Sequence, residues 1–354
     1  MMLLNHLWHA IEFSANVTCQ PQKITLMGKS IVLYRHDQGQ VIALDDRCVH
    51  RGASLALGWV EDNCLRCPYH GWKYGTDGRC LEIPAHASEM SIPKRARVTH
   101  YEVMERHGFI WLWLGDGAAD PTLIPTLPQF ADALSGSQWY GSRDQFRWNA
   151  HYSRVIENNV DVSHPPFLHR RLGQRQDQAV QIPSLVVEPI GELGASVTLT
   201  AKMQKLQGPW QALVSQQGEL GSKRRHAFYL PNFTTLELSF GRFHLAFLMA
   251  HVPIAPDVTI TKSLILRNFL KFSWLDPSIN QFGQKLLRED EQVVKTQAAP
   301  SIQLDRQDLL VPSDAMILAY RQLYRKYAGL DLPTVDSTVD STVDPTVDPV
   351  VTKR

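Results

Sequence analysis

The sequence predicts an α+β protein with an all-β first part and a second part that mixes strands and helices. Apolar runs separated by turn residues extend to about residue 117, and a proline-rich connector covers 118–137. Both strand-like and helix-like apolar patterns then occur over 138–330. The chain has 354 residues, enough for two domains with separate cores, because a domain usually holds about 100–200 residues.

In the first predicted domain, 1–117, the apolar runs 31–34 and 41–44 flank a turn-prone segment, which indicates a hairpin. The apolar run 108–114 closes this domain. The connector contains Pro121, Pro125 and Pro128, and proline cannot continue a helix or a central strand. This segment therefore marks a domain boundary.

The second predicted domain, 138–330, contains alternating strand and helix signals. We expect strands near 185–187, 196–201, 228–238 and 243–252, and helices near 151–164, 277–297 and 313–328. From Thr334 onward, Thr-Val-Asp followed by Ser or Pro is repeated. Such a short polar period has no core to bury, so we expect a disordered tail over 331–354.

Composition argues against several classes of partner and location. The formal net charge is +1, which gives no whole-chain attraction for nucleic acid or an anionic membrane surface. The N-terminus lacks the pattern of a signal peptide, and the longest apolar stretch, 245–254, is too short to span a membrane. Cys19, Cys64 and Cys80 are an odd and scattered set rather than a disulfide framework, although Cys64 and Cys80 flank the cluster loops and could pair. We expect a cytoplasmic protein without a membrane anchor.

Two short segments carry the strongest chemical signal. Cys48-Val49-His50 and Cys67-Pro68-Tyr69-His70 each offer one thiolate and one imidazole in the same order. A two-iron cluster can bind both cysteines on one iron and both histidines on the other, which is the ligand set of a Rieske [2Fe–2S] centre. A zinc site built from the same residues is the alternative, although common zinc fingers place two cysteines first and two histidines later.

A second set of candidate ligands follows in 157–169. Asp161 and His164 are three residues apart, hence on one helical face, and Pro165-Pro166 should stop the helix and let His169 approach from the next turn. Two histidines beside a carboxylate suit a non-haem Fe(II) that needs open positions for O2 and substrate.

The third ligand is sought on the helix predicted near 277–297. At about 100° per residue, Asp290 lies about 20° from the centre of its apolar stripe and Glu289 about 80° away. A buried carboxylate is costly unless it is paired or bound to metal, so Asp290 is the predicted ligand. If the helix phase is misjudged, Asp290 is a solvated acid and Glu289 takes its role.

Other clusters have plainer interpretations. The run Lys223-Arg224-Arg225-His226 is interpreted as a solvated loop, with a docking patch for an acidic redox partner as the alternative. The aromatic residues between 228 and 249 are interpreted mainly as core, and some of them as the lining of a cavity for an apolar substrate.

Taken together, the motifs resemble those of the oxygenase (α) component of Rieske non-haem iron oxygenases. The chain is similar in particular to the vanillate and dicamba O-demethylase branch, over about 1–330. The matching motifs are Cys48-x-His50 with Cys67-x-x-His70, Asn158-x-x-Asp161-x-x-His164-x-x-x-x-His169, and Asp290.

The resemblance implies a Rieske [2Fe–2S] domain followed by a helix-grip (START-like) catalytic domain. It also implies a mononuclear Fe(II) held by His164, His169 and Asp290, with Asn158 and Asp161 as catalytic residues. The expected assembly is a head-to-tail homotrimer in which Asp161 links one subunit's cluster to its neighbour's iron.

The expected activity is hydroxylation or oxidative demethylation of a small aromatic or polycyclic molecule by O2. Electrons from NAD(P)H would arrive through a separate ferredoxin or flavin reductase. One alternative is a Rieske electron-transfer protein whose second domain only binds a ligand or partner, and another is a regulatory module that binds a hydrophobic ligand without turnover. Mononuclear iron content distinguishes the oxygenase from both.

Overall fold

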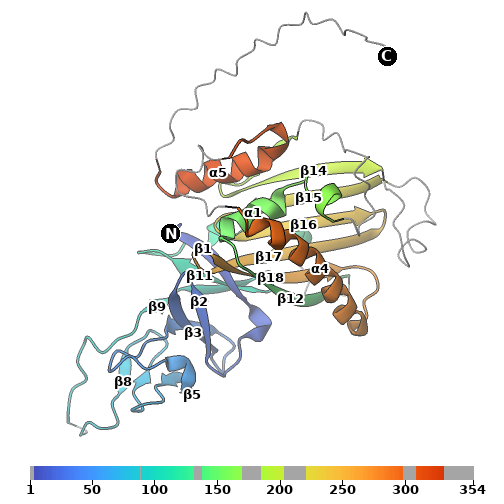
Figure 1. The fold of residues 1–354 in the computed structure, drawn as a ribbon. Helices are drawn as coiled ribbons and strands as arrows, with labels where there is room; N and C mark the ends of the chain where they lie inside the picture. Colours follow the sequence, from blue (N-terminus) through green and yellow to red (C-terminus); the bar gives the residue numbers. More distant parts are fainter. Residues whose placement is uncertain are drawn as a thin grey trace, which may run out of the picture.

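The computed structural model describes residues 4–87, 89–130, 138–169, 185–202, 221–297 and 308–330. The predicted tail, 331–354, lies outside these ranges. Within them, an all-β N-terminal part is followed by a larger part in which helices cover a sheet (Figure 1). The α+β class and the order of the two parts are confirmed.

Three antiparallel sheets form the N-terminal part, in the orders β1-β11-β10, β2-β3-β4-β9 and β5-β6-β7-β8. The predicted hairpin is present, since Arg35 in β3 pairs with Val41 in β4. The strands are β1 (Leu7–Phe13), β2 (Gln22–Leu26), β3 (Lys29–Arg35), β4 (Val41–Asp45), β5 (Trp59–Glu61), β6 (Cys64–Arg66), β7 (Lys73–Tyr74), β8 (Cys80–Glu82), β9 (His100–Tyr101), β10 (Val103–Arg106) and β11 (Phe109–Leu114).

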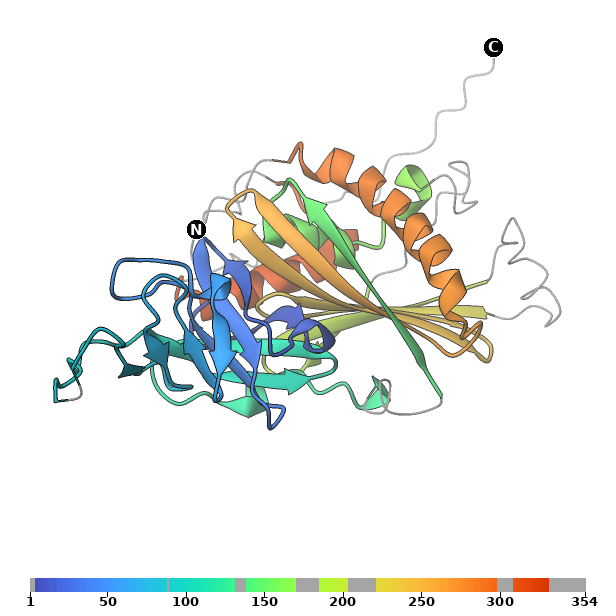
Figure 2. The ribbon, with the colours of Figure 1, turned by 90° about the horizontal axis from the view of Figure 1, so that it is seen from below.

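One antiparallel seven-stranded sheet, in the order β12-β18-β17-β16-β15-β14-β13, forms the centre of the second part. Its strands are β12 (Tyr140–Trp148), β13 (Val187–Ile190), β14 (Gly194–Lys202), β15 (Gly221–Tyr229), β16 (Phe233–Phe240), β17 (Phe243–Ala255) and β18 (Val258–Arg267). The main helices are α1 (Tyr152–Val160), α2 (Pro165–Leu168), α4 (Asp276–Val294) and α5 (Ala315–Tyr327). Figure 2 shows the helices on one side of this sheet and the N-terminal strands on the other.

The two parts share a hydrophobic core, so the expectation of separate cores is wrong. Phe109 and Trp111 of β11 lie in the same buried cluster as Phe233 of the large sheet, with ring centroids 5.4 and 5.0 Å from it. The cause is that β1 and β11 are buried along their whole lengths, so neither has a face left for solvent.

Buried polar contacts join the same two parts. The side chain of Asn232 donates to the carbonyl of Ala10 at 2.8 Å and accepts from its N–H at 3.1 Å. The Lys262 ammonium lies 2.8 Å from the buried Glu12 carboxylate. A buried ion pair leaves an uncompensated charge when either partner is removed, so this pair fixes how the sheets meet.

Three sequence predictions need correction. The strand expected over 228–238 is two strands, because β15 ends at Tyr229, Leu230-Pro231-Asn232 forms the turn and β16 begins at Phe233. The basic run 223–226, expected in a loop, lies inside β15. Residues 222–226 are all polar or basic, so no apolar alternation marks this strand, which forms through pairing with β14 and β16 on either side.

The third correction concerns the helix predicted over 151–164. It ends at Val160, and Pro165-Pro166 begin the short helix α2 instead of stopping a longer one. Proline is well suited to the first turn of a helix, where its missing N–H has no intrahelical partner. Asp161 and His164 therefore lie in the connection between two helices. No helix in the described ranges is long and apolar enough to cross a membrane.

Candidate functional site

The two cysteine and histidine loops have nearly the same backbone geometry. In each loop the N–H of the glycine four residues after the cysteine donates to the cysteine carbonyl, at 2.8 Å for Gly52 and 3.0 Å for Gly71. Both glycines have positive φ, +78° and +70°, which a side chain disfavours. The local sequence thus makes two matching turns that present one ligand pair each.

Within this pair of loops the thiols are buried and the imidazoles are exposed. Cys48 and Cys67 are 2% and 1% exposed, whereas His50 and His70 lie at the surface with ring centroids 4.5 Å apart. The ring of His50 also stacks on Trp72 at 4.7 Å. Burial and the neighbouring Cys48 thiol raise the pKa of Cys67, although backbone N–H groups of its own loop oppose this shift. Two facing buried thiols that form no disulfide suit a bound metal centre.

One further contact at this site was not foreseen from the sequence. The hydroxyl of Tyr74 lies 3.1 Å from Sγ of Cys48, inside the small core that surrounds both cysteines. A hydroxyl donates to a cysteine sulfur when that sulfur is a metal-bound thiolate, and such hydrogen bonds help to set the reduction potential of an iron–sulfur cluster.

The second candidate site brings together His164, His169 and Asp290. Their ligand atoms all lie within 4.8 Å of one another. Oδ1 of Asp290 is 3.5 Å from Nε2 of His164 and 3.1 Å from Nε2 of His169. This oxygen is buried and has no hydrogen-bond partner. Three donors that converge on a point without bonding one another fit a metal ion.

Each of these histidines is oriented by a second carboxylate. Asp161 lies 3.1 Å from Nδ1 of His164, and Glu289 lies 3.0 Å from Nδ1 of His169. A carboxylate accepts the Nδ1 proton, which leaves the Nε2 lone pair free for a metal. Glu289, weighed from the sequence as an alternative ligand, thus contacts the Nδ1 side of His169, whereas Asp290 lies on the Nε2 side that faces the metal position.

The charges around the three donors favour a cation. Burial raises the pKa of Asp161, but the hydrogen bonds from His164 and Ser163 outweigh burial and hold this pKa below its usual range. Burial lowers the pKa of His169, but Asp290 and Glu289 outweigh it and leave this pKa above its usual value. The negative charge of the carboxylates at this site is balanced by a bound proton or by a metal ion.

Asn158, the other predicted catalytic residue, is half-buried, and its side chain has no hydrogen bond with the described part of the chain. Its neighbour Asn159 makes the contacts instead. The Asn159 carbonyl accepts from Nδ1 of His226 at 3.0 Å, and its side-chain oxygen accepts from Thr234 at 3.1 Å. A role for Asn158 stays a prediction, while Asn159 is a residue that sequence reasoning missed.

Behind Asn159, a buried polar chain reaches across the sheet. His251 is fully buried, and its two ring nitrogens lie 2.8 Å from the hydroxyls of Thr234 and Thr261. Burial lowers the pKa of His251 to about 3, so the ring is neutral. The sequence does contain a signal for this contact, since His251 lies within an apolar strand and a buried imidazole needs hydrogen-bond partners.

A cluster of four charges holds the middle of α1. Glu157 of α1 lies 2.7 Å from Arg321 of α5 and 2.9 Å from Arg154. Asp308 lies 2.6 Å from Arg154 and 2.7 Å from Arg321. Because both arginines contact both carboxylates, the cluster fixes α1 relative to α5.

Comparison with known proteins assigns the family. Residues 7–102 match the model of the Rieske [2Fe-2S] domain, and residues 148–329 match that of the vanillate O-demethylase oxygenase C-terminal domain. The chain belongs to the Rieske oxygenases. The resemblance of its motifs to this family is confirmed, and a Rieske oxygenase holds a [2Fe–2S] cluster and a mononuclear non-haem iron.

Curated relatives of this Rieske oxygenase match over part of their length. The putative toluene-4-sulfonate monooxygenase system iron-sulfur subunit TsaM2 of Comamonas testosteroni is 33% identical over 48% of this chain and 47% of its own. The 4beta-methylsterol monooxygenase of Methylococcus capsulatus is 36% identical over 46% of this chain and 44% of its own. The chain thus spans about half the length of the curated relatives it matches.

Solved structures share the fold of this Rieske oxygenase over almost its whole length. Dicamba monooxygenase bound to dicamba has a TM-score of 0.78 at 20% identity, over 93% of this chain and 98% of its own. Pseudomonas putida CBB5 NdmA with caffeine has a TM-score of 0.75 at 23% identity, over 91% of this chain and 90% of its own.

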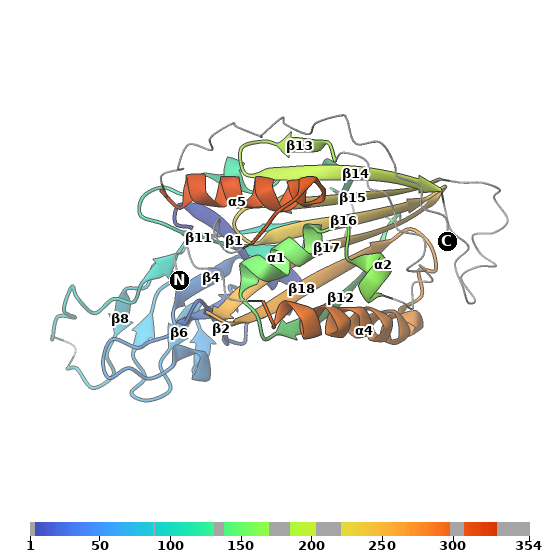
Figure 3. The same cartoon turned by 45° about the horizontal axis from the view of Figure 1, so that its top comes forward.

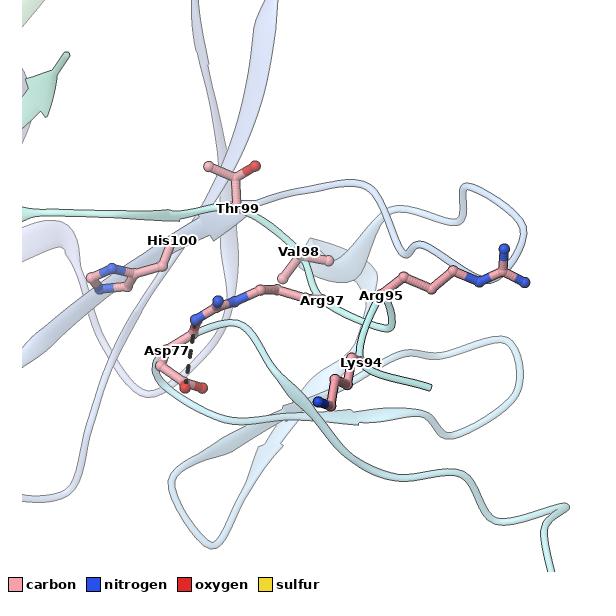
Figure 4. Close-up of a pocket in the computed structure, with 7 residues that line it drawn as sticks. All are labelled: Asp77, Lys94, Arg95, Arg97, Val98, Thr99 and His100. Atoms are coloured by element: carbon pink, nitrogen blue, oxygen red, sulfur yellow. Dashed lines mark hydrogen bonds and ion pairs between the residues drawn. The ribbon is translucent and has the colours of Figure 1, made fainter. Parts of the chain in front are cut away.

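The Rieske part also has a basic hollow of about 610 Å³ (Figure 4). Lys94, Arg95 and Arg97 line this hollow together with one acidic residue, Asp77, which lies 3.8 Å from Arg97. The other residues that line the hollow are Val98, Thr99 and His100. Val98 also belongs to the core around Cys48 and Cys67, so the hollow adjoins the cluster-binding core.

Replacing Tyr74 with Phe removes the donor to the Cys48 sulfur and should lower the midpoint potential of the cluster. A hydrogen bond with a net value of about 0.5–1.5 kcal/mol corresponds to roughly 20–65 mV for one electron. The potential is measured by redox titration followed by electron paramagnetic resonance. Tyr34→Phe is the control, because Tyr34 is buried in the same core but donates to the backbone of Asn63 at 3.3 Å. Equal shifts in both variants would contradict a role for the sulfur contact.

Proposed function

We propose that this Rieske oxygenase uses O2, with electrons from NAD(P)H delivered by a separate reductase, to hydroxylate or oxidatively demethylate a small aromatic or polycyclic substrate. The observation that carries the proposal is the convergence of His164, His169 and Asp290, with a buried Asp290 oxygen that lacks a hydrogen-bond partner. Two histidines and one carboxylate hold Fe(II) on one side and leave its other positions open.

The proposed ligands of the two metal groups are separate. Cys48 and Cys67 hold one iron of the cluster and His50 and His70 the other, while His164, His169 and Asp290 hold the mononuclear iron. When bound, the mononuclear iron supplies the activation of O2 with electrons from the cluster.

The surrounding residues keep the site ready for this chemistry. Asp161 and Glu289 hold the Nδ1 protons of the two histidines, so the rings cannot turn away from the metal position. Burial of His169 and Asp290, 6% and 5% exposed, keeps bulk water from the donors. The site is thereby organised before substrate arrives.

The electron-transfer alternative is disfavoured by the same geometry. A protein that only carried electrons would need no converging histidines and carboxylate in its second part. A regulatory ligand-binding module would equally leave these donors without a purpose. The names of relatives, which include a methylxanthine N1-demethylase and a 3-chlorobenzoate-3,4-dioxygenase subunit, support oxygenation of ring compounds.

Replacing Asp290 with Ala should abolish the mononuclear iron and substrate-stimulated O2 consumption while the visible spectrum of the cluster remains. Iron is counted against acid-labile sulfide, and O2 uptake is followed with NADH and a surrogate reductase across a panel of ring compounds. Glu289→Gln is the matched control on the same helix. It keeps the ligand and weakens iron affinity by roughly 10- to 100-fold. Full iron content in Asp290→Ala would refute the assignment.

We also propose a cytoplasmic head-to-tail homotrimer in which electrons cross between subunits. Figure 3 shows the sheet β5-β6-β7-β8, which carries the cluster loops, at one end of the molecule, and α2, which follows His164, well away from it. The cluster tip is exposed, with Tyr69 58% exposed beside the surface residues His50 and His70. An exposed tip far from its own iron site suits delivery to a neighbouring copy, with Asp161 as the bridge at the receiving iron.

Mixed assemblies test this arrangement. A Cys67→Ser chain lacks a cluster and an Asp290→Ala chain lacks the mononuclear iron, so neither should be active alone, whereas their co-expressed assembly should regain O2-dependent turnover. Adding Asp161→Asn to the Cys67→Ser chain should remove the regained activity. Adding the same change to the Asp290→Ala chain should not, because that chain only donates electrons. Inactive mixed assemblies would contradict transfer between subunits.

The redox partner, we propose, is an acidic ferredoxin or flavin reductase that docks at the basic hollow around Lys94, Arg95 and Arg97. Neither Lys94 nor Arg95 has an ion pair with the described part of the chain, so both charges remain available. Opposite charges on two surfaces speed association, and salt screens this effect over about 10 Å at 0.1 M.

Replacing Lys94 and Arg95 with Glu should slow cluster reduction by the reductase roughly tenfold or more at low ionic strength, because the charge reversal repels an acidic partner. Stopped-flow absorbance measures the rate. The difference from the wild type should shrink as salt rises. Lys285→Glu, a change at an exposed lysine of α4, is the control and should reduce at the wild-type rate. An unchanged rate in the double variant would mean that docking occurs elsewhere.

A further inference from the structure

Arg224 lies on the face of the large sheet that carries the iron site. Its strand neighbours His226 and Phe228, at alternate positions of β15, share this face, and His226 bonds to Asn159 at the end of α1. Figure 3 shows α1 and α2 over this face. Arg225 points the other way and pairs with Glu237 at 2.9 Å. The strand thus directs one arginine toward the helices and one away from them.

The guanidinium of Arg224 has no hydrogen bond or ion pair with any described residue, although the side chain is only half-exposed. Burial lowers the pKa of Arg224, and no neighbouring carboxylate opposes this shift. An arginine nevertheless stays charged in proteins, and a partly buried charge without a partner is unfavourable. Among the described residues, the fork of donors on Arg224 is therefore free to bind an anion.

Arg224 and the iron site are both close to the ring of His226. Burial lowers the pKa of His226 to about 4, the Asn159 carbonyl opposes this, and the charges of Arg224 and His164 lower it further. The charges of Arg224 and of the proposed iron ligand His164 thus both act on the imidazole of His226. Because the Asn159 carbonyl can only accept, Nδ1 of His226 carries the proton and Nε2 is left as an acceptor.

Apolar residues flank Arg224 on both neighbouring strands of this face. Residues directly opposite one another in antiparallel strands share a face, and the partners of Arg224 are Leu199 and Leu238. The partners of His226 are Val197 and Leu236, and Phe247 lies next to Leu236. The face thus offers apolar surface, one neutral acceptor and one unpaired cation.

We infer that Arg224 binds an oxyanion, a carboxylate or a sulfonate, on a ring-containing substrate whose apolar body lies on the same sheet face. A guanidinium matches such groups through two parallel N–H bonds. The anion would anchor one end of the substrate while the rest extends past His226 toward the iron site. The inference rests on the proposed oxygenase function for the identity of the bound molecule as substrate, and it narrows that substrate to anionic ring compounds.

Binding to the oxidised holoenzyme without reductase tests this inference independently of turnover. Isothermal titration calorimetry compares two anions, 4-methylbenzoate and toluene-4-sulfonate, with their neutral amides. Wild type should bind at least one anion roughly tenfold or more tightly than its amide. Arg224→Gln should weaken the binding of that anion by roughly 10- to 100-fold, as expected for loss of a charge-assisted hydrogen bond. The affinity for the amide should stay within about twofold of the wild-type value.

Lys223→Gln is the control, because it removes the same charge from an exposed position on the opposite face of β15. Arg224→Lys keeps the charge without the fork and should bind the anion with intermediate affinity, which also guards against a folding defect in Arg224→Gln. Equal binding of anion and amide, no binding of any probe by wild type, or the same loss in Lys223→Gln would overturn the inference. Turnover of neutral ring compounds with no preference for anions would overturn it and leave the oxygenase function intact.

Discussion

The attachment of the last turn of α1 to the large sheet is the constraint on which the iron site depends. Asn159 bonds to His226 and Thr234, and Thr234 bonds to the buried His251. Asp161 and His164 follow Asn159 directly, so their positions depend on where that turn ends. A neutral histidine held by two hydroxyls is costly to displace, because each broken hydrogen bond leaves a buried polar group unsatisfied. The polar chain therefore orients ligands that it does not touch.

The large sheet is buried on both of its faces. One face packs on the N-terminal strands, and the other carries α1, α2 and α4 with the iron site. The sheet thus connects the Rieske part rigidly to the catalytic part, and a change in the shared core would disturb both. Because the sheet with the cluster loops lies at one end of the molecule, well away from α2, this rigidity fits the proposed electron delivery between copies.

In both candidate metal sites, the side chains that can carry a charge have a partner nearby. Cys48 and Cys67 are buried opposite each other, and the histidines of the iron site each have a carboxylate behind the ring. Arg224 is the exception, since its charge has no partner among the described residues. A charge without a partner among the described residues, on the face that carries the candidate iron site, is the reason for the anionic ligand that we infer there.

The sequence by itself determined the class of fold and the cluster motif, and it predicted the three residues that the structure brings together as candidate iron donors, because ligand spacing and helical period are local properties of the chain. It also favoured Asp290 over Glu289 on their helix. Only the tertiary structure decided the contacts of Glu289, Asn159 and His251 and the orientation of Arg224, since each depends on strands or helices that are distant in sequence. The orientation of Arg224 follows from strand register. Side chains alternate along β15, so Arg225 points toward Glu237 and Arg224 lies on the face covered by helices. A run of basic residues in the sequence does not indicate which of them lies on which face.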